Sequence, residues 1–414
     1  MKEQPLQLFY LNRRELLIAD RIKAAAESPT LKLTSKIKKL KEQGLNIIEL
    51  NIGEPDLPTP ENIKNAGKNA LDNNFTKYTV NQGITSLREE ISKKLQTENS
   101  IFYSPDEIVV STGAKQSVYN AIMAVINPGD EVIIPAPYYV SYPEIVKLAG
   151  GIPVFVDGDK KNFLKPDANN IEKTISNKTK MIVLCNPNNP TGAVLNKAEL
   201  EKIAKIVIKN RLYVLVDEIY EKLVYDDIKF CSFASIDPEL KKYTILVNGV
   251  SKSFCMTGWR LGFVASNKEI INAINILQSH QTGNTSSITQ YAAFAAYNLE
   301  KEFSLYLKNE FEKRRNLFYE LLTKIPGIKL DKPNGAFYLF PNISYYIGSS
   351  FGAFTINNSE DFCDFILDNA GIAVVPGTAF GTEGYIRIAY TIEQEEIKKA
   401  ATLMSAAISK LIKV

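Results

Sequence analysis

The sequence predicts an α/β protein, with a large sheet of mainly parallel strands between helices and a smaller α+β part built from both chain ends. Between residues 106 and 266, short β-branched runs alternate with helical or turn segments. These runs are mostly apolar throughout, which is typical of strands that helices cover on both faces. The 414 residues also provide enough chain for two domains and a large core.

Seven strands are expected in this central block. The first, "DEIVVST", runs directly into a helix that Pro128 and Gly129 close. The other six runs are bounded by turn or helix signals. The expected strands cover residues 106–112, 131–136, 152–157, 180–185, 211–218, 243–248 and 261–266.

The segments on either side of this block predict the smaller domain. A lysine-rich amphipathic helix and a Pro-rich turn come before the block, and a long charged helix follows it. The tail then alternates strands with helices, at 335–340, 361–371, 384–390 and a closing helix that ends at Leu411. We therefore expect residues 1–58, with an N-terminal arm, and 316–414 to form the small domain, and residues 59–315 to form the large one.

Composition excludes several classes of function. The net charge is only +3, and no basic cluster alternates with aromatic residues, so nucleic acid is not an expected partner. No stretch approaches the roughly 20 apolar residues of a membrane span, and the N-terminus does not resemble a signal peptide. The four cysteines are far apart, which argues against a structural metal and fits a reducing cytoplasm. A catalytic triad or a histidine metal site would depend entirely on His280.

Lys252 is the first candidate for a chemical role. It lies in "NGVSKSFCMTGWRLGF", just after the expected strand 243–248. Most lysines are solvated surface residues, but an ammonium group buried at the end of a sheet needs a partner or a covalent use. The neighbouring strand ends decide between these two interpretations.

Those strand ends carry further polar motifs. "STGAKQS" lacks the G-x-G-x-x-G pattern of dinucleotide sites, but its small residues allow an anion to approach the start of a helix. "VLCNPNNPTG" ends another strand with an Asn-Pro pair, and "VLVDEIY" places Asp217 at a strand end, where open α/β sheets bind ligands. A carboxylate there needs a cationic partner. Arg260 follows Lys252 in the same motif.

Taken together, these motifs resemble the class I/II aminotransferases, which are fold-type I enzymes dependent on pyridoxal 5′-phosphate. The resemblance runs from about Ala19 to the C-terminus and is most specific in "NPNNPTG", "DEIYEKLVY" and "SKSFCMTGWRLGF". Within the family, the chain is most similar to the bacterial Ib subgroup through "GEPDLPTPENI", "KYTVNQGITSLREEI" and "PYYVSYPEIV". Members of that subgroup act on aspartate, and some also transaminate prephenate.

The resemblance implies catalytic roles for three residues. Lys252 would carry the cofactor as a Schiff base and then move the proton, and Asp217 would hold the pyridine nitrogen protonated. Tyr220 and Asn189 would bind the 3′-oxygen of the cofactor. Tyr139 would stack on the ring, at a position where tryptophan is common in the family.

The resemblance also implies a phosphate site and a dimer. Arg260, Ser251 and the backbone amides of Gly113 and Ala114 would bind the phosphate, in a turn that continues with Lys115. Tyr78 matches a tyrosine that reaches the phosphate of the neighbouring subunit, so the expected assembly is a homodimer with composite sites.

The substrate site implied by the resemblance comprises Gly53, Thr30, Lys115, Tyr139, Asn189 and Arg387. Arg387 would clamp the α-carboxylate with its two-pronged guanidinium group, and the backbone of Gly53 would close over the substrate. Lys115 with Thr30 would bind a second carboxylate, although a lysine at the start of a helix is often only a surface residue.

The expected reaction moves the amino group of aspartate, or of a similar dicarboxylic amino acid, to 2-oxoglutarate by a ping-pong mechanism. Alternatives that remain open are transfer to prephenate, an aromatic aminotransferase and a lyase that uses the same cofactor. A transcription regulator would need an N-terminal DNA-binding module, for which the residues before the match leave no room. His280 is expected to be a polar lining or interface residue, and Trp259 a core residue.

Overall fold

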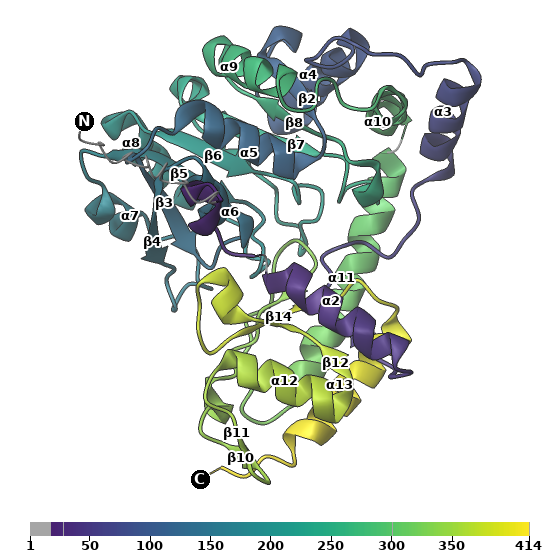
Figure 1. The fold of residues 1–414 in the computed structure, drawn as a ribbon, viewed down its shortest axis with the longest axis vertical. Helices are drawn as coiled ribbons and strands as arrows, with labels where there is room; N and C mark the ends of the chain where they lie inside the picture. Colours follow the sequence, from purple (N-terminus) through teal and green to yellow (C-terminus); the bar gives the residue numbers. More distant parts are fainter. Residues whose placement is uncertain (1–17, 28, 300, 414) are drawn as a thin grey trace, which may run out of the picture.

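The computed structural model describes residues 18–27, 29–299 and 301–413, so most of the expected N-terminal arm lies outside the described residues. The chain forms a larger part, which holds a seven-stranded sheet, and a smaller part, which includes the C-terminus (Figure 1). The long helix α11 (Lys301–Thr323) runs from one part to the other. The division at residues 58 and 315 is not tested by this arrangement and stays a prediction.

The larger part is built on a seven-stranded sheet with the order β2-β8-β7-β6-β5-β3-β4. Strand β8 runs antiparallel to both of its neighbours, and the other pairs are parallel. The predicted seven-stranded, mainly parallel sheet is therefore confirmed. The strands are β2 (Ile108–Ser111), β3 (Glu131–Ala136), β4 (Ile152–Asp157), β5 (Thr179–Cys185), β6 (Tyr213–Asp217), β7 (Thr244–Gly249) and β8 (Gly262–Ala265).

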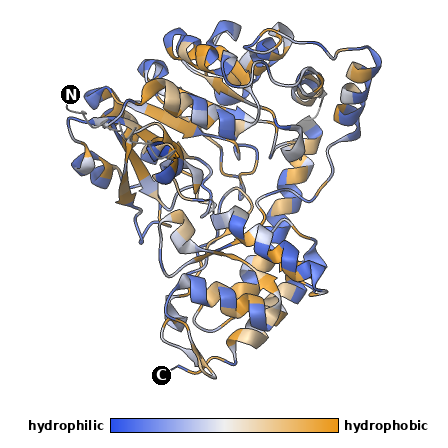
Figure 2. Ribbon diagram, viewed as in Figure 1, coloured by the Kyte–Doolittle hydropathy of each residue, from blue (hydrophilic) through white to orange (hydrophobic). Residues whose placement is uncertain are grey.

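Helices cover both faces of this sheet, as the apolar strands require. In β2, Val109 packs into the core under α5, α6 and α9, whereas Ile108 and Val110 pack on the other face, beside α4 and α10. The strands accordingly form a continuous apolar layer in Figure 2. The helices of this part are α3 (Glu61–Asp72), α4 (Thr85–Asn99), α5 (Ala114–Val125), α6 (Ser141–Leu148), α7 (Ala168–Thr174), α8 (Lys197–Asn210), α9 (Lys268–Ser279) and α10 (Ser287–Leu299).

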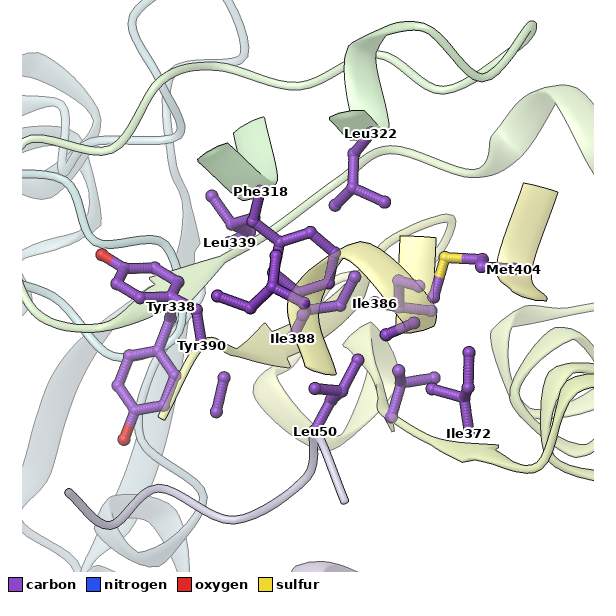
Figure 3. Packing of buried hydrophobic residues seen from close by; sticks show 14 of the residues in the cluster. Leu50, Phe318, Leu322, Tyr338, Leu339, Ile372, Ile386, Ile388, Tyr390 and Met404 are labelled. Atoms are coloured by element: carbon purple, nitrogen blue, oxygen red, sulfur yellow. The ribbon is translucent and has the colours of Figure 1, made fainter. Parts of the chain in front are cut away.

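The second part joins the two chain ends through a pair of strands that the sequence did not reveal. Strand β1 (Ile48–Glu49) pairs in parallel with β12 (Ile372–Ala373), which brings Leu50 into the same core as Ile388. Figure 3 shows this packing. The remaining elements of this part are α2 (Pro29–Glu42), β9 (Tyr338–Leu339), β10 (Ser350–Phe351), β11 (Phe354–Thr355), α12 (Ser359–Ala370), β13 (Val375–Pro376), β14 (Ile386–Ala389) and α13 (Gln394–Ile408). The short helix α1 (Asp20–Lys23) lies instead against α6 of the larger part.

Several of the expected tail elements are shorter than the sequence pattern indicates. Only Tyr338–Leu339 of the run 335–340 and Ile386–Ala389 of the run 384–390 form strands, in a three-stranded sheet with β13. Short strands suffice here because α11, α12 and α13 bury their faces. Within the described ranges, no helix is long and apolar enough to cross a membrane.

Candidate active site

A cavity of about 640 Å³ lies where the two parts of the molecule meet. Strands β2, β3, β5, β6 and β7 point the same way, so their carboxyl ends share one edge of the sheet. Residues from these ends line the cavity, and α2, β14 and the segment after β1 close it. Of the residues expected to act in the site, it gathers Thr30, Gly53, Ala114, Lys115, Tyr139, Asn189, Asp217, Tyr220, Ser251, Lys252, Arg260 and Arg387.

Lys252 lies in the turn after β7, and its Nζ donates a hydrogen bond to the carbonyl of Gly53 at 2.7 Å. Burial lowers the pKa of Lys252 to about 8, an effect that Arg387 and Arg260 reinforce and that Glu54 and Asp217 oppose. A lysine with this pKa is partly neutral near physiological pH, and a neutral amine can act as a nucleophile or a base.

Asp217 ends β6, with only 6% of its surface exposed. Its carboxylate accepts hydrogen bonds from the Tyr142 hydroxyl at 3.0 Å and from the Ile219 amide at 3.2 Å. Burial nevertheless raises the pKa of Asp217 to about 6, against the effects of Tyr142, Ile219 and Lys252. A buried carboxyl group that still ionises near neutral pH favours a cationic ligand in the cavity.

The turn that follows Asp217 is anchored from behind by two further carboxyl groups. Glu218 accepts hydrogen bonds from the Ser232 hydroxyl at 2.8 Å and the Phe233 amide at 3.0 Å. Glu221 pairs with Lys94 of α4, which is also buried. Asp217 and Tyr220 of the same turn line the cavity, so the turn is held on one side and presents its functional groups on the other.

We expect the Glu218→Gln variant to gain stability relative to the wild type between about pH 5 and pH 8. Burial, reinforced by the charge of Glu221, raises the pKa of Glu218 to about 8. Because this folded-state pKa lies above the unfolded-state pKa, the stability that Glu218 contributes to the wild type is fully present below the unfolded-state pKa. The wild type loses this stability as the pH rises through the folded-state pKa, whereas the variant does not, because glutamine does not titrate. The gain should reach at least about 1.4 kcal/mol, the equivalent of one pKa unit. Urea unfolding of both proteins across this pH range measures the gain. A difference in the free energy of unfolding that does not change with pH would contradict the prediction.

A candidate anion site lies beside Arg260, at the start of α5. Helix α5 begins at Ala114, and a Cβ on the preceding Gly113, which has φ of 85°, would come within 2.5 Å of the Arg260 guanidinium. Arg260 is held by a hydrogen bond from its Nη1 to the Thr257 carbonyl at 2.9 Å. The amide of Gly113, which was expected to bind a phosphate, donates instead to the Ser111 carbonyl at 2.8 Å. The amides at the start of α5, together with Arg260 and Ser251, form a site suited to phosphate.

Arg387 projects from β14 into the cavity between two aromatic rings. Its guanidinium carbon lies 4.6 Å from the centroid of the Tyr338 ring and 5.0 Å from that of Phe380. Its Nη atoms donate hydrogen bonds to Asn189 Oδ1 at 3.1 Å and to the Asn51 carbonyl at 2.7 Å. Its Nε is buried without a hydrogen-bond partner among the described residues, so the guanidinium retains donor capacity for a carboxylate.

Aromatic hydroxyl groups and one further cation complete the lining. The hydroxyls of Tyr220 and Tyr338 share a hydrogen bond of 2.8 Å. The Lys115 ammonium lies 5.7 Å from the centroid of the Tyr139 ring. Lys115 also lines a neighbouring hollow of about 530 Å³, so it lies between the two cavities. Thr30 and Thr34 approach from α2.

Three residues singled out in the sequence lie elsewhere. Tyr78 is 99% exposed and away from the cavity of its own chain. His280 is an exposed residue that caps the end of α9. Trp259 donates a hydrogen bond to Thr59 and packs against the core beside α3, near Gly67.

Sequence reasoning missed several residues of the site, namely Tyr142, Tyr338, Phe380 and Asn51. Tyr338 lies in a run that was interpreted only as a strand, and Tyr142 lies in the quoted stretch "PYYVSYPEIV". In neither case does the local pattern distinguish a buried tyrosine of the site from one of the core. The lining as a whole offers a phosphate cradle, an aromatic wall, a buried carboxylate and an amine, and it can hold a flat, phosphorylated, cationic ring.

Comparisons with known proteins agree with this chemistry. A family model described as aminotransferase class I and II matches residues 46–403. The chain is 43% identical over 384 residues to an aspartate aminotransferase of Bacillus sp. (strain YM-2), covering 93% of this chain and 97% of that protein. It is 45% identical over 386 residues to a probable aspartate/prephenate aminotransferase of Rickettsia conorii, covering 93% of this chain and 96% of that protein. The crystal structure of the aspartate aminotransferase from Rhizobium meliloti is also similar, with a TM-score of 0.93, 38% identity and coverage of 96% and 100%.

Proposed function

Because the chain belongs to the class I and II aminotransferase family, we propose that it transfers the amino group of aspartate to 2-oxoglutarate, giving oxaloacetate and glutamate. The observation that carries this proposal is that, of the four cationic residues that line the cavity in the described part of the chain, two are left for a substrate once Lys252 and Arg260 are assigned to the cofactor, namely Arg387 and Lys115. A dicarboxylic amino acid presents two carboxylates, and each needs a charge-assisted partner once water is excluded.

The cofactor of this family is pyridoxal 5′-phosphate, and the residues of the cavity fit it. The absence of a Cβ at Gly113 leaves room beside Arg260 for a phosphate, and the buried Asp217 carboxyl group favours a cationic nitrogen. When bound, the cofactor supplies an electron-withdrawing ring that stabilises negative charge on the substrate Cα. We assign the phosphate to Ser251, Arg260 and the amides at the start of α5.

The chain's own residues then divide the remaining work. Lys252 holds the cofactor covalently and moves the Cα proton, a role suited to an amine whose pKa is lowered to about 8. Asp217, when ionised, would hold a proton on the ring nitrogen. Tyr220 and Asn189 would bind the ring oxygen, and Tyr139 would cover the ring face. Arg387 orients the substrate through its α-carboxylate, and Gly53 closes the backbone over it.

A substitution at Lys115 tests the proposed preference for dicarboxylic substrates. We expect Lys115→Ser to lower kcat/KM for aspartate and glutamate by about 10- to 100-fold, equivalent to about 1.4–3 kcal/mol. A slow aromatic or aliphatic amino acid should be almost unaffected, because its side chain presents no charge. Steady-state kinetics with aspartate and phenylalanine compare the two cases. Equal losses would show that Lys115 is structural and that the acidic preference needs another cation.

The reaction itself is tested by mixing the holoenzyme with single amino acids and following the loss of visible absorbance as the bound cofactor gains the amino group. Rapid conversion by aspartate and glutamate is the expected result. Conversion by alanine or phenylalanine alone would overturn the proposal.

A second candidate acceptor is prephenate, because several similar proteins from Rickettsia carry the name aspartate/prephenate aminotransferase. Prephenate also presents two carboxylates, so the same two cations can bind it. Supplying prephenate to the amine form of the holoenzyme and measuring arogenate distinguishes the two acceptors.

We further propose that the enzyme works as a homodimer in the cytoplasm. Tyr78 is almost fully exposed, and Val80 and Ile276 are also exposed, which is costly for apolar side chains unless a partner covers them. The four cysteines are free thiols, which is consistent with a reducing compartment.

If Tyr78 completes the phosphate site of a second copy, Tyr78→Phe should weaken cofactor binding about tenfold while leaving the dimer intact. The loss corresponds to one hydrogen bond to a charged group. Equilibrium dialysis measures the binding, and sedimentation velocity measures the assembly. A fully active wild-type monomer would remove this role for Tyr78.

A further inference from the structure

Tyr142 connects two residues of the cavity from behind. It is the second residue of α6, and only 1% of its surface is exposed. Its hydroxyl donates to Asp217 Oδ2 at 3.0 Å. Its ring packs edge-on against the ring of Tyr139, with 5.4 Å between the centroids and 79° between the planes.

We infer that Tyr142 is a positioning residue, whose hydroxyl keeps the Asp217 carboxylate aimed into the cavity and ionised, and whose ring supports Tyr139. The inference rests on the proposed function, since it concerns the two residues assigned there to the nitrogen and the face of the cofactor ring. No motif in the sequence points to this role.

The hydrogen bonds of Asp217 show why one hydroxyl matters. Oδ1 accepts from the backbone amide of Ile219, which the turn fixes. Among the described residues, the hydroxyl of Tyr142 is the side-chain donor to Oδ2. The nearby Cys185 thiol donates instead to the Pro187 carbonyl at 3.3 Å, so it does not replace Tyr142 as a donor to the carboxylate. Removing the hydroxyl would leave Oδ2 buried without a donor from the chain.

The charges around Asp217 make the carboxylate sensitive to this loss. The titratable groups that interact with it are Tyr142 from α6, Cys185 from β5 and Lys252 from the turn after β7. Burial raises the pKa of Asp217 to about 6 even with the Tyr142 bond, which is the largest opposing effect. Without that bond, a larger fraction of Asp217 is protonated near neutral pH. A neutral carboxyl group cannot balance a protonated ring nitrogen.

The ring of Tyr142 has a second, separable effect. An edge-to-face contact fixes the tilt of the partner ring, because the positive edge of one ring faces the negative face of the other. Phenylalanine at position 142 keeps this contact and loses only the hydroxyl, whereas leucine loses both. The two substitutions therefore separate the two parts of the proposal.

The test uses the full-length holoenzyme and its Tyr142→Phe variant, with retention of pyridoxal 5′-phosphate during dialysis as the readout. If the pKa of Asp217 in the cofactor-free chain rises by about one unit, its ionised fraction at pH 6 falls from about one half to about one tenth. The cofactor affinity of Tyr142→Phe should therefore be about fivefold below that of the wild type at pH 6, and the two affinities should be closer at pH 8.5. The titration of the cofactor itself is common to both proteins, so it cancels in the ratio of their affinities.

Tyr346→Phe is the matched control, because the hydroxyl of the buried Tyr346 donates to the Pro326 carbonyl and neither residue lines the cavity. It should lower thermal stability without changing cofactor retention at either pH. Tyr142→Leu should weaken retention at pH 8.5 as well, through the loss of support for Tyr139.

A Tyr142→Phe variant that retains the cofactor as the wild type does at pH 6, or one whose loss is equal at both pH values, would overturn the ionisation role. Retention by Tyr142→Leu equal to that of Tyr142→Phe at pH 8.5 would overturn the support of Tyr139. Failure of the wild type to transaminate aspartate would instead overturn the proposed substrate, because cofactor retention does not depend on it.

Discussion

Replacing Lys252 by alanine should lower the turnover number by at least about 10⁴-fold, the upper range for the loss of a positioned general base. Lys252 is the amine of the cavity that the turn after β7 presents beside Asp217, and its lowered pKa makes its neutral form accessible. Without it, neither the covalent hold on the cofactor nor the transfer of the Cα proton has a group to perform it. Multiple-turnover assays with aspartate and 2-oxoglutarate measure the effect.

The same variant should still bind the cofactor, because the phosphate cradle at Gly113 and Arg260 and the carboxylate of Asp217 remain in place. Its visible spectrum should differ from that of the wild type, since the covalent link is absent. Lys173→Ala, which removes an exposed lysine on α7, is the matched control and should retain full activity. Substantial turnover by Lys252→Ala without an added amine would exclude Lys252 from its assigned role.

The residues of the site that could be predicted from the sequence are those at strand ends. Asp217 and Lys252 each follow an apolar run, and parallel strands bring their carboxyl ends to one edge of a sheet. Once the runs are interpreted as parallel strands, the proximity of these residues follows without any contact being known. The roles of the remaining site residues came from the resemblance to a family.

The residues that could not be predicted meet through tertiary packing between distant segments. Tyr338 shares a hydrogen bond with Tyr220, 118 positions away in the sequence. Strand β1 is only two residues long, yet its pairing with β12 carries Leu50 into the core and Asn51 to the lining of the cavity. Such short elements are stabilised by the surfaces that cover them, so their own sequences carry little signal.

The second large effect is expected at Arg387. We expect Arg387→Gln to lower kcat/KM for aspartate by about 10²- to 10³-fold, in keeping with the loss of one partner of a buried charge pair. Glutamine keeps a donor and an acceptor but loses the charge and the two-pronged geometry that match a carboxylate. The loss should extend to phenylalanine and alanine, because every amino acid substrate carries the α-carboxylate. Lys115→Ser, by contrast, should affect only dicarboxylic substrates.

Arg315 provides the control, because it is a buried arginine whose carboxylate partner belongs to the chain. It pairs with Asp226 at 2.5 Å and lies 4.9 Å from the centroid of the Tyr225 ring, which parallels the stacking of Arg387 on Tyr338. Arg315→Gln leaves Asp226 with only its longer contact to Lys332 and removes the guanidinium that stacks on Tyr225, so it should lower stability, with kcat/KM retained at temperatures where the variant is folded. Arg387→Gln should cost much less stability, since the carboxylate that Arg387 serves arrives with the substrate. Equal losses of stability in the two variants, with kcat/KM unchanged in Arg387→Gln, would show that Arg387 is a structural residue.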